Sequence, residues 1–429
     1  GGAVGGEGGG EGEMINFGSR RASLVLTCVP QVIPFFQRVR LFQTLIDRDK
    51  NSLGLVDSHF FTSSGVNDVT INRDTIYEDA LATLDRLGPH LKGRIRVTYE
   101  SEHGYQEAGI DGGGLFRDFM DKLTERCFDP ASTFFKETSD HLIYPDPTSS
   151  LVPGCLKHFE FMGRVLGKAV YDQILLRPQF AAPFLNKLLD RNNVIDDLYT
   201  IDPELYKHLL SLKQLTKTEG VNLEDLSLFF TVGTGGKGDR KGEVELIKNG
   251  NDIPVTNSNY LEYIYRVAHF KLNSETSRQS KAFLRGFHDL IPVDWIKMFD
   301  AQELQMVIGG EQRGIDIENM KKFTSYGGGY HESQPIMQWF WDIMADFTPN
   351  EQSDFLKFVT SSSRQPLLGF EFMNPPFCIQ KVPLDDAGQK LPSAGTCMSL
   401  LKLPEYRDKE TMRLKILYAI SSNAGFELS

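Results

Sequence analysis

The sequence predicts an α+β protein of two lobes that are joined by a glycine hinge. Apolar residues recur at helical spacing along most of the 429 residues, and a few short segments alternate as strands do. Three consecutive glycines, Gly327, Gly328 and Gly329, lie between two tyrosines, and successive glycines can absorb large changes in backbone dihedral angles. The segment after them has helix and strand signals of its own over about 100 residues, near the commonest domain size. A plain surface loop is the alternative interpretation of these glycines.

Composition limits the class of protein. Hydrophobic residues make up 40% and charged residues 24%, as is typical of a globular protein, and the length suggests two or three domains. The net charge of −11 argues against a nucleic-acid partner, because nucleic-acid binders need a basic surface. No apolar run reaches the length of a membrane span, so we expect no membrane partner.

The cysteines indicate the compartment. Their number is odd, none forms a CxxC pair, and they are scattered at Cys28, Cys127, Cys155, Cys378 and Cys397. We therefore expect neither a zinc site nor a disulfide framework, and no motif calls for another metal or a cofactor. A reducing compartment, the cytoplasm or the nucleus, fits this pattern.

The N-terminal end is a tail rich in glycine and glutamate. Residues 1–13 are expected to be disordered, and 1–29 to form a tail and lead-in to the first lobe. Because the chain does not begin with Met, we expect it to be a fragment of a longer protein.

A helix, a strand and a glycine-rich turn are predicted next. A helix should begin near residue 37, and residues 94–100 alternate as a strand does. The turn at 109–114 then precedes another helix, which suggests a phosphate loop. The Lys-Ser/Thr pair of such a loop is missing, so a structural turn is the favoured interpretation.

The middle of the chain is mostly helical. One helix has the apolar face Phe159, Met162, Leu166 and Val170. Asp202 and Pro203 are predicted as the N-cap and first residue of a second helix. Short strands are expected at 226–232 and 244–248, with a solvated hairpin connection at 233–242. Thr256 or Asn257 should cap a further helix, which carries Tyr260, Tyr263, Ile264, Val267 and Phe270.

After the glycines come two helices, a polar loop, a strand and a last helix. Thr348 and Glu351 form a capping box at the start of the second of these helices. The loop at 391–397 brings Cys397 to the start of an apolar run at 398–403. A thiolate is strongly nucleophilic and forms thioesters readily, although a lone cysteine is more often inert. No histidine follows Cys397, so a papain-like mechanism is excluded and exchange with an activated thioester fits better.

At this point the sequence resembles the HECT ubiquitin ligase catalytic domain, from about Phe36 to Ser429. The matching motifs are RDTIYEDA at 73–80, EAGIDGGG at 107–114, YP at 144–145, FMGRVLGKA at 161–169, DIPVTN at 252–257, LPSAGTC at 391–397 and AGFELS at 424–429. Each motif is short, but their order and spacing are highly specific. The segments at 398–404 and 425–429 look closest to the proteasome-associated branch of the family and its plant relatives.

The resemblance implies a bilobed HECT fold. A large, mostly helical N-lobe at 30–326 would include a small subdomain at 178–273 that binds the conjugating enzyme. The hinge would lie at 327–330, and an α/β C-lobe at 331–429 would carry the nucleophile.

The resemblance also implies a reaction. Cys397 would accept ubiquitin from a conjugating enzyme as a thioester and pass it to lysines of protein substrates or of ubiquitin. The expected products are polyubiquitin chains for proteasomal degradation. A non-catalytic docking platform is the alternative, and an unrelated thiol hydrolase is disfavoured by the missing histidine.

Other site residues follow from the same resemblance. Tyr263 and Val267 match apolar positions that contact the conjugating enzyme, although an ordinary core stripe explains them as well. Phe426 matches a phenylalanine that supports transfer to lysine, or it is an apolar plug for the tail. Thr396 could donate a hydrogen bond near the thioester carbonyl, or serve the loop geometry alone.

One position departs from the family pattern. Many members have a histidine two residues before the cysteine, where this chain has Gly395. A base at that position is therefore missing, and we expect Glu427 or the terminal carboxylate to deprotonate the incoming lysine.

Overall fold

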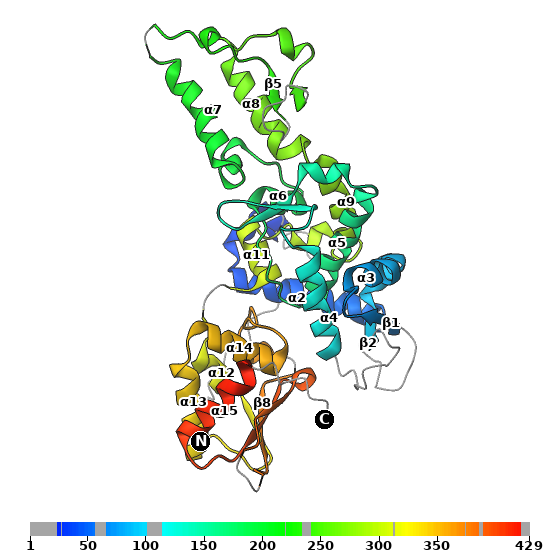
Figure 1. The fold of residues 1–429 in the computed structure, drawn as a ribbon, viewed down its shortest axis with the longest axis vertical. Coiled ribbons are helices and arrows are strands. Elements are labelled where there is room, and N and C mark those ends of the chain that lie inside the picture. The colour runs from blue at the N-terminus through cyan, green and yellow to red at the C-terminus, as the bar shows by residue number, and fades with distance from the viewer. Residues whose placement is uncertain are drawn as a thin grey trace, which may run out of the picture.

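The computed structural model describes residues 24–26, 28–55, 66–100, 114–218, 220–233, 242–311, 314–373, 375–385 and 389–421. Buried apolar side chains in these ranges form three separate cores. We call the parts of the chain around them the first, second and third unit. Figure 1 shows the units in a row along the longest axis, with the first in the middle and the second and third at opposite ends. None of the helices in the described ranges has the length and apolar character needed to cross a bilayer.

The first unit contains most of the helices. Its elements are α2 (Phe35–Ser52), β1 (Val66–Asn72), α3 (Ile76–Leu84), β2 (Arg94–Glu100), α4 (Gly114–Cys127), β3 (Phe135–Glu137), β4 (Ile143–Pro145), α5 (Cys155–Tyr171), α6 (Ala182–Leu188), α9 (Ser277–His288), α10 (Val293–Ile296) and α11 (Ala301–Gly309). The predicted strand at 94–100 is confirmed, and its alternate residues Ile95, Val97 and Tyr99 are buried. Its parallel partner β1 was not predicted.

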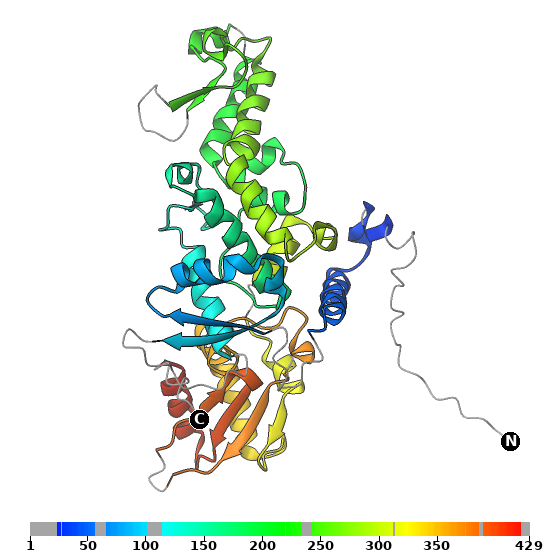
Figure 2. The ribbon, with the colours of Figure 1, turned by 90° about the vertical axis from the view of Figure 1, so that its right-hand side faces the viewer.

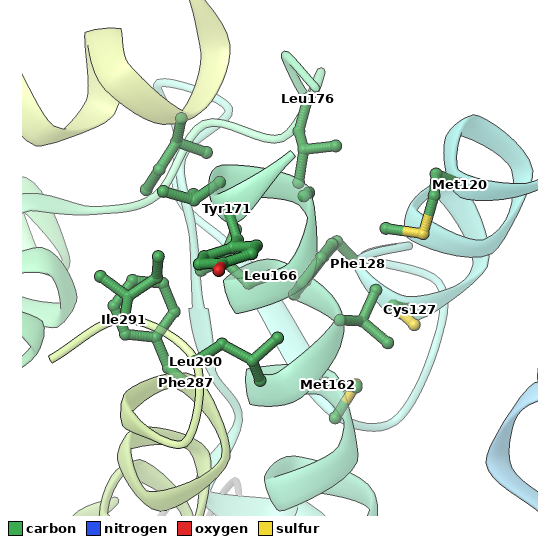
Figure 3. Packing of buried hydrophobic residues seen from close by; sticks show 14 of the residues in the cluster. Met120, Cys127, Phe128, Met162, Leu166, Tyr171, Leu176, Phe287, Leu290 and Ile291 are labelled. Carbon is green, nitrogen blue, oxygen red and sulfur yellow. The ribbon is translucent and has the colours of Figure 1, made fainter. Parts of the chain in front are cut away.

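Helix α5 is the centre of the first unit. Figure 3 shows Met162, Leu166 and Tyr171 of α5 between Phe287 of α9 on one side and Met120 and Cys127 of α4 on the other. The predicted apolar face of α5 is confirmed, because Phe159, Met162, Leu166 and Val170 are all buried. Burial also raises the pKa of the Cys127 thiol far above its usual range, so this cysteine is inert at neutral pH.

The second unit is small. Its main elements are the 3-10 helix η4 (Ile195–Thr200), α7 (Pro203–Leu215), β5 (Thr231–Gly233), β6 (Glu243–Glu245) and α8 (Tyr260–His269), which continues through a π-helical turn (Phe270–Ser274) toward α9. The predicted cap is confirmed, because the Asp202 side chain accepts a hydrogen bond from the Leu205 N–H. The strands are shorter than predicted, and the N-cap of α8 is Asn259.

The second unit also begins later than expected. The apolar residues Phe180, Phe184 and Leu188 belong to the core of the first unit, and the core of the second starts at Leu198. The chain therefore enters the second unit near residue 194 and not at 178, because α6 packs against α9 and α11 of the first unit.

The third unit is a four-stranded sheet with helices. Its elements are α12 (Ile317–Lys322), β7 (Ser325–Gly327), α13 (Pro335–Asp346), α14 (Pro349–Thr360), β8 (Cys378–Val382), β9 (Ser393–Gly395), β10 (Leu400–Pro404) and α15 (Lys409–Ser421). The strand order is β7-β8-β10-β9, with β9 alone antiparallel to its neighbour. The capping box of Thr348 and Glu351 is confirmed. Ile379, Leu401 and Leu403 face a helical layer, which Figure 2 shows behind the strands.

The boundary of the third unit lies before the glycines, which corrects the expectation of a lobe boundary at 326. Strand β7 pairs with β8, so Gly327 is part of the sheet. Met320 and Tyr330 are both buried in the third core. The chain passes from the first unit to the third between Gly309, the last residue of α11, and Asp316, the N-cap of α12. A three-residue strand has too short a pattern to be recognised from sequence.

Candidate active site

Cys397 lies at the tip of a β-hairpin. Its backbone is in the one-turn helix η10 (Thr396–Met398), which connects β9 to β10. Leu400 pairs with Gly395 on one side and with Cys378 on the other, so three strands hold the base of this connection. The neighbouring Met398 is 61% exposed, which places the tip at the surface. The side chain of Cys397 lies outside the described part of the structure.

Ser399 ends the turn that carries Cys397. It adopts a left-handed conformation with φ 47°, which non-glycine residues rarely do, and it is fully buried. Its N–H donates to the Thr396 carbonyl at 3.3 Å, and its carbonyl accepts from the Cys378 N–H at 3.0 Å. Its buried hydroxyl has no hydrogen-bond partner among the described residues. Sequence reasoning missed this residue, because nothing in the pattern at 391–403 signals a left-handed serine.

Gly395 is not required by the backbone. Its φ of −106° is ordinary, and an added Cβ would meet only Leu400 side-chain atoms, the nearest at 3.6 Å. A Cβ therefore fits at this position, so neither the backbone conformation nor close packing at the Cβ requires glycine here.

Two buried tyrosines hold the strands near the cysteine turn. The Tyr330 hydroxyl donates to the Leu403 carbonyl at 3.2 Å, and the Tyr406 hydroxyl donates to the Lys390 carbonyl at 2.7 Å. Burial raises the pKa of both phenols above the usual range, so both stay protonated donors at all physiological pH values.

The three glycines form a turn at the end of β7. Gly328 has φ 67°, and an added Cβ would lie 2.7 Å from the Lys381 carbonyl oxygen, so only glycine fits there. Gly329 has φ 98° and open space around it. These glycines serve a tight turn inside the third unit, which agrees with the loop interpretation and not with the hinge.

The structure separates Tyr263 from Val267. Val267 is only 1% exposed and belongs to the core of the second unit. Tyr263 is half-buried, with its ring edge-on to Phe230 at 5.5 Å between centroids. The exposed apolar residues of α8 are Leu261 and Tyr265, at 58% and 61%. Their i, i+4 spacing, opposite the buried stripe, is a signal that could have found them.

Phe426 and Glu427 lie outside the described residues, as do the tail at 1–23, the turn at 109–113 and most of the loop at 233–242. Thr396 is half-buried at the start of η10. Among the described residues, no group of three or more side chains is suited to hold a metal ion.

The comparison with protein families decides the identity of the fold. The model described as HECT-domain (ubiquitin-transferase) matches residues 121–429. The chain belongs to this family. The matched range contains all of the third unit, and the strand pair β1 and β2 lies before it, although both strands pack in the first core.

Relatives of this HECT chain include three proteins with similar sequences over nearly all of it. It is 42% identical to the E3 ubiquitin-protein ligase UPL6 of Arabidopsis thaliana over 417 residues, which cover 95% of this chain and 39% of that protein. It is 42% identical to the Ubiquitin-protein ligase E3B of Homo sapiens, over 96% of this chain and 41% of that protein. It is 37% identical to the E3 ubiquitin-protein ligase HUL5 of Saccharomyces cerevisiae, over 94% of this chain and 45% of that protein. The chain thus spans less than half the length of these relatives.

Proposed function

We propose that this HECT chain is a ubiquitin-protein ligase in which Cys397 carries ubiquitin as a thioester. The observation that supports this most is the place of Cys397, at the surface tip of a hairpin whose base three strands hold. A nucleophile that must receive and release a whole protein needs such an accessible and fixed position. The names of the relatives, all ligases for ubiquitin, support the same proposal.

The proposed reaction has two steps. The Cys397 thiolate attacks the thioester carbonyl between ubiquitin and the conjugating enzyme, and the cysteine of that enzyme leaves as a thiolate. A lysine amine of the substrate or of another ubiquitin then attacks the new thioester. The Cys397 thiolate leaves, and the amine proton passes to a base. Glu427 or the terminal carboxylate is the proposed base, with Phe426 and Thr396 as supporting residues.

The test is a loading assay. The chain is incubated with activating enzyme, a panel of conjugating enzymes and ubiquitin, and the products are separated without reductant. We expect an adduct on the wild type that thiols remove, and none on Cys397→Ala. If no conjugating enzyme in the panel gives such an adduct, the result contradicts the proposal and favours the alternative of a docking platform. An unchanged rate of lysine discharge in Glu427→Gln would exclude Glu427 as the base.

The second unit is the proposed docking site for the conjugating enzyme. The sequence resemblance indicates Tyr263 and Val267, and because Val267 is buried we propose that it supports the contact from beneath. Tyr263 and the exposed residues Leu226, Phe229, Leu261 and Tyr265 offer apolar surface at this end of the molecule. Exposed apolar side chains on a small unit are typical of a protein-binding surface.

The wider role is also part of the proposal. The resemblance of the C-terminal sequence to the proteasome-associated branch supports polyubiquitin chains that direct substrates to the proteasome, in the cytoplasm or nucleus. Mass spectrometry of the reaction products measures whether chains form. If the products carried only single ubiquitins on their lysines, chain formation would be contradicted and the proposed ligase reaction would stand.

A further inference from the structure

One loop of the third unit packs on the core of the first unit. This loop, residues 361–373 between α14 and β8, is called the strap below. Its Leu367 and Leu368 pack against the core of the first unit, although α14 and β8 on either side belong to the third. The surface that receives them includes Val39 and Phe42 of α2 and Val307 of α11. The strap is therefore a second connection between the units, in addition to the covalent link at 310–316.

The strap also binds both ends of that link. The Arg364 guanidinium donates to the carbonyl of Gly309, the last residue of α11. Helix C-termini leave carbonyls without helical partners, and a cation there is favoured by the helix dipole. The side-chain oxygen of the next residue, Gln365, accepts from the Asp316 N–H at 2.8 Å, where α12 begins. The strap thus contacts the last residue of α11 on one side of the link and the N-cap of α12 on the other.

Polar contacts in and beside the strap also join the first unit to the third. Lys357 of α14 forms an ion pair with Asp121 of α4 at 3.4 Å. The guanidinium of Arg40 lies over the ring of Phe372, 4.4 Å from its centroid. These groups are partly exposed, and exposed ion pairs stabilise weakly. The strap is thus specific in its contacts but not tightly bound.

The packing at the strap is incomplete. A cleft of ≈ 330 Å³ lies between the units, lined by Arg117 and Asp172 of the first and by Thr360 and Arg364 of the third. A smaller pocket of ≈ 80 Å³ lies beside Leu367 and Leu368. Protein cores are close-packed, and side chains that line a void lose dispersion contacts. An interface with two such spaces releases more readily than a core does.

We propose that the strap is a releasable latch, and that Arg364 and Leu368 are positioning residues for ubiquitin transfer. The latch holds the third unit in the orientation of Figure 1, at the opposite end of the molecule from the second unit. The part of this inference that concerns transfer rests on the proposed function, because only then must Cys397 approach an enzyme bound at the second unit. Release of the strap frees the link at 310–316 and lets the third unit turn toward that enzyme.

The latch itself is tested without any enzymatic assay. Fluorescent donor and acceptor dyes are attached to the full chain at the exposed positions 150 and 410, through non-cysteine chemistry that leaves Cys397 free. Single-molecule energy transfer then reports the distance between the units. In Arg364→Ala and in Leu368→Ala, we expect the population with an altered distance to grow by about threefold or more. Glu371→Ala, at an exposed position of the same strap, is the matched control and should behave as wild type.

Arg364→Lys tests whether the hydrogen bond, and not the shape of the guanidinium, holds the strap in place. Its ammonium can still donate to the Gly309 carbonyl, so it should restore part of the wild-type distribution. Far-ultraviolet circular dichroism confirms that each variant is folded. Identical distance distributions in wild type, Arg364→Ala and Leu368→Ala would overturn the latch.

The positioning role is tested by the two half-reactions. In Arg364→Ala and Leu368→Ala, the ratio of the thioester loading rate to the rate of discharge to lysine should rise by about threefold. A general loss of stability would lower both rates together. An unchanged ratio in folded variants overturns the positioning role. If the wild type forms no thioester at all, the proposed function fails, and the distance measurement still decides on the latch.

Discussion

Gly163 of α5 and Gly286 of α9 lie at the crossing of the two helices, and each faces the backbone of the other helix. A Cβ on Gly163 would overlap the Phe283 carbonyl oxygen, and a Cβ on Gly286 would overlap the Glu160 carbonyl oxygen. The helices are therefore in backbone contact at this crossing, which only glycine permits. This contact lies in the core of the first unit, which includes Met162 and Phe283 on either side of the crossing.

The first prediction concerns this crossing. Gly163→Ala and Gly286→Ala should each destabilise the first unit by about 3 kcal/mol, because the helices must separate to admit the methyl group. Urea denaturation followed by circular dichroism measures the change. Gly233→Ala, at a position with open space around the glycine, is the control and should change little. Equal stability of all three variants would contradict the backbone contact.

The second prediction concerns Ser399. Ser399→Gly should stabilise the third unit by about 1 kcal/mol, because it relieves the left-handed strain and removes a buried hydroxyl that has no partner among the described residues. Ser393→Gly, in the extended strand β9, is the matched control and should destabilise. Thermal unfolding measures both. A loss of stability in Ser399→Gly would mean that the hydroxyl has a partner.

The third prediction concerns acid pH. Arg164 forms ion pairs with Asp85, Glu160 and Asp289 at 2.5 to 2.8 Å, which connect α5 to α9 and to the segment after α3. Burial would raise the pKa of Glu160, but the hydrogen bond from Arg285 and the charge of Arg164 outweigh it and hold the pKa below 4.5. A lowered pKa stabilises the fold above that value, and the stabilisation is lost as the carboxylate takes up a proton.

Glu160→Gln should therefore be less stable than wild type at pH 6 to 8 by a constant amount of about 1–2 kcal/mol. The difference should shrink as the pH falls below about 4.5. Denaturation at a series of pH values measures it. A difference that does not vary between pH 3 and pH 7 would contradict the assignment.

The fourth prediction concerns alkaline pH. The Lys187 ammonium has only the hydroxyls of Thr276 and Ser280 as near partners in the described structure, each at 3.3 Å, and burial lowers its pKa to about 8. Between pH 8 and pH 10.5 the unfolded chain binds more protons at this residue, so stability rises with pH through this range.

Lys187→Met should remove this rise. The variant should be more stable than wild type at pH 7, and its advantage should decrease above pH 8. Lys213→Met, on exposed surface of α7, serves as the control. Parallel pH profiles for wild type and Lys187→Met would show that this amine stays charged in the folded state.

The fifth prediction concerns the second unit. Leu261→Ala and Tyr265→Ala should each lower the rate of thioester loading by about tenfold at limiting conjugating enzyme, if these residues contact that enzyme. Leu151→Ala, a highly exposed leucine of the first unit, is the control. Val267→Ala should instead lower thermal stability, because Val267 lies in the core. If both surface variants load ubiquitin at the wild-type rate, the conjugating enzyme does not dock at Leu261 and Tyr265.

The sequence predicted the long helices well, because their signals are local. The loop expected at 391–397 instead contains the strand β9 at 393–395, which forms through its pairing with β10. The face of α5 and the caps at Asp202 and Thr348 follow from spacing and side-chain chemistry within a few residues. The parallel pair of β1 and β2 could not be predicted, because its hydrogen bonds join residues that are 28 positions apart in the chain, as Val66 and Arg94 are, and leave no local pattern. Likewise, α8 has apolar residues on two faces, and only packing decides that Val267 is buried while Tyr265 is exposed.

By itself, the sequence indicated the family and most of the long helices, and it is the basis for proposing Cys397 as the nucleophile. The motif at 391–397 and the match of residues 121–429 to the HECT-domain model require no coordinates. Only the tertiary structure decided where the units divide. It placed Gly327 within a sheet, moved the link to 310–316, and brought Arg364 onto the end of α11. The physical reason is that local signals report the conformation of a segment, whereas the core to which a segment belongs depends on contacts with residues far away in the chain.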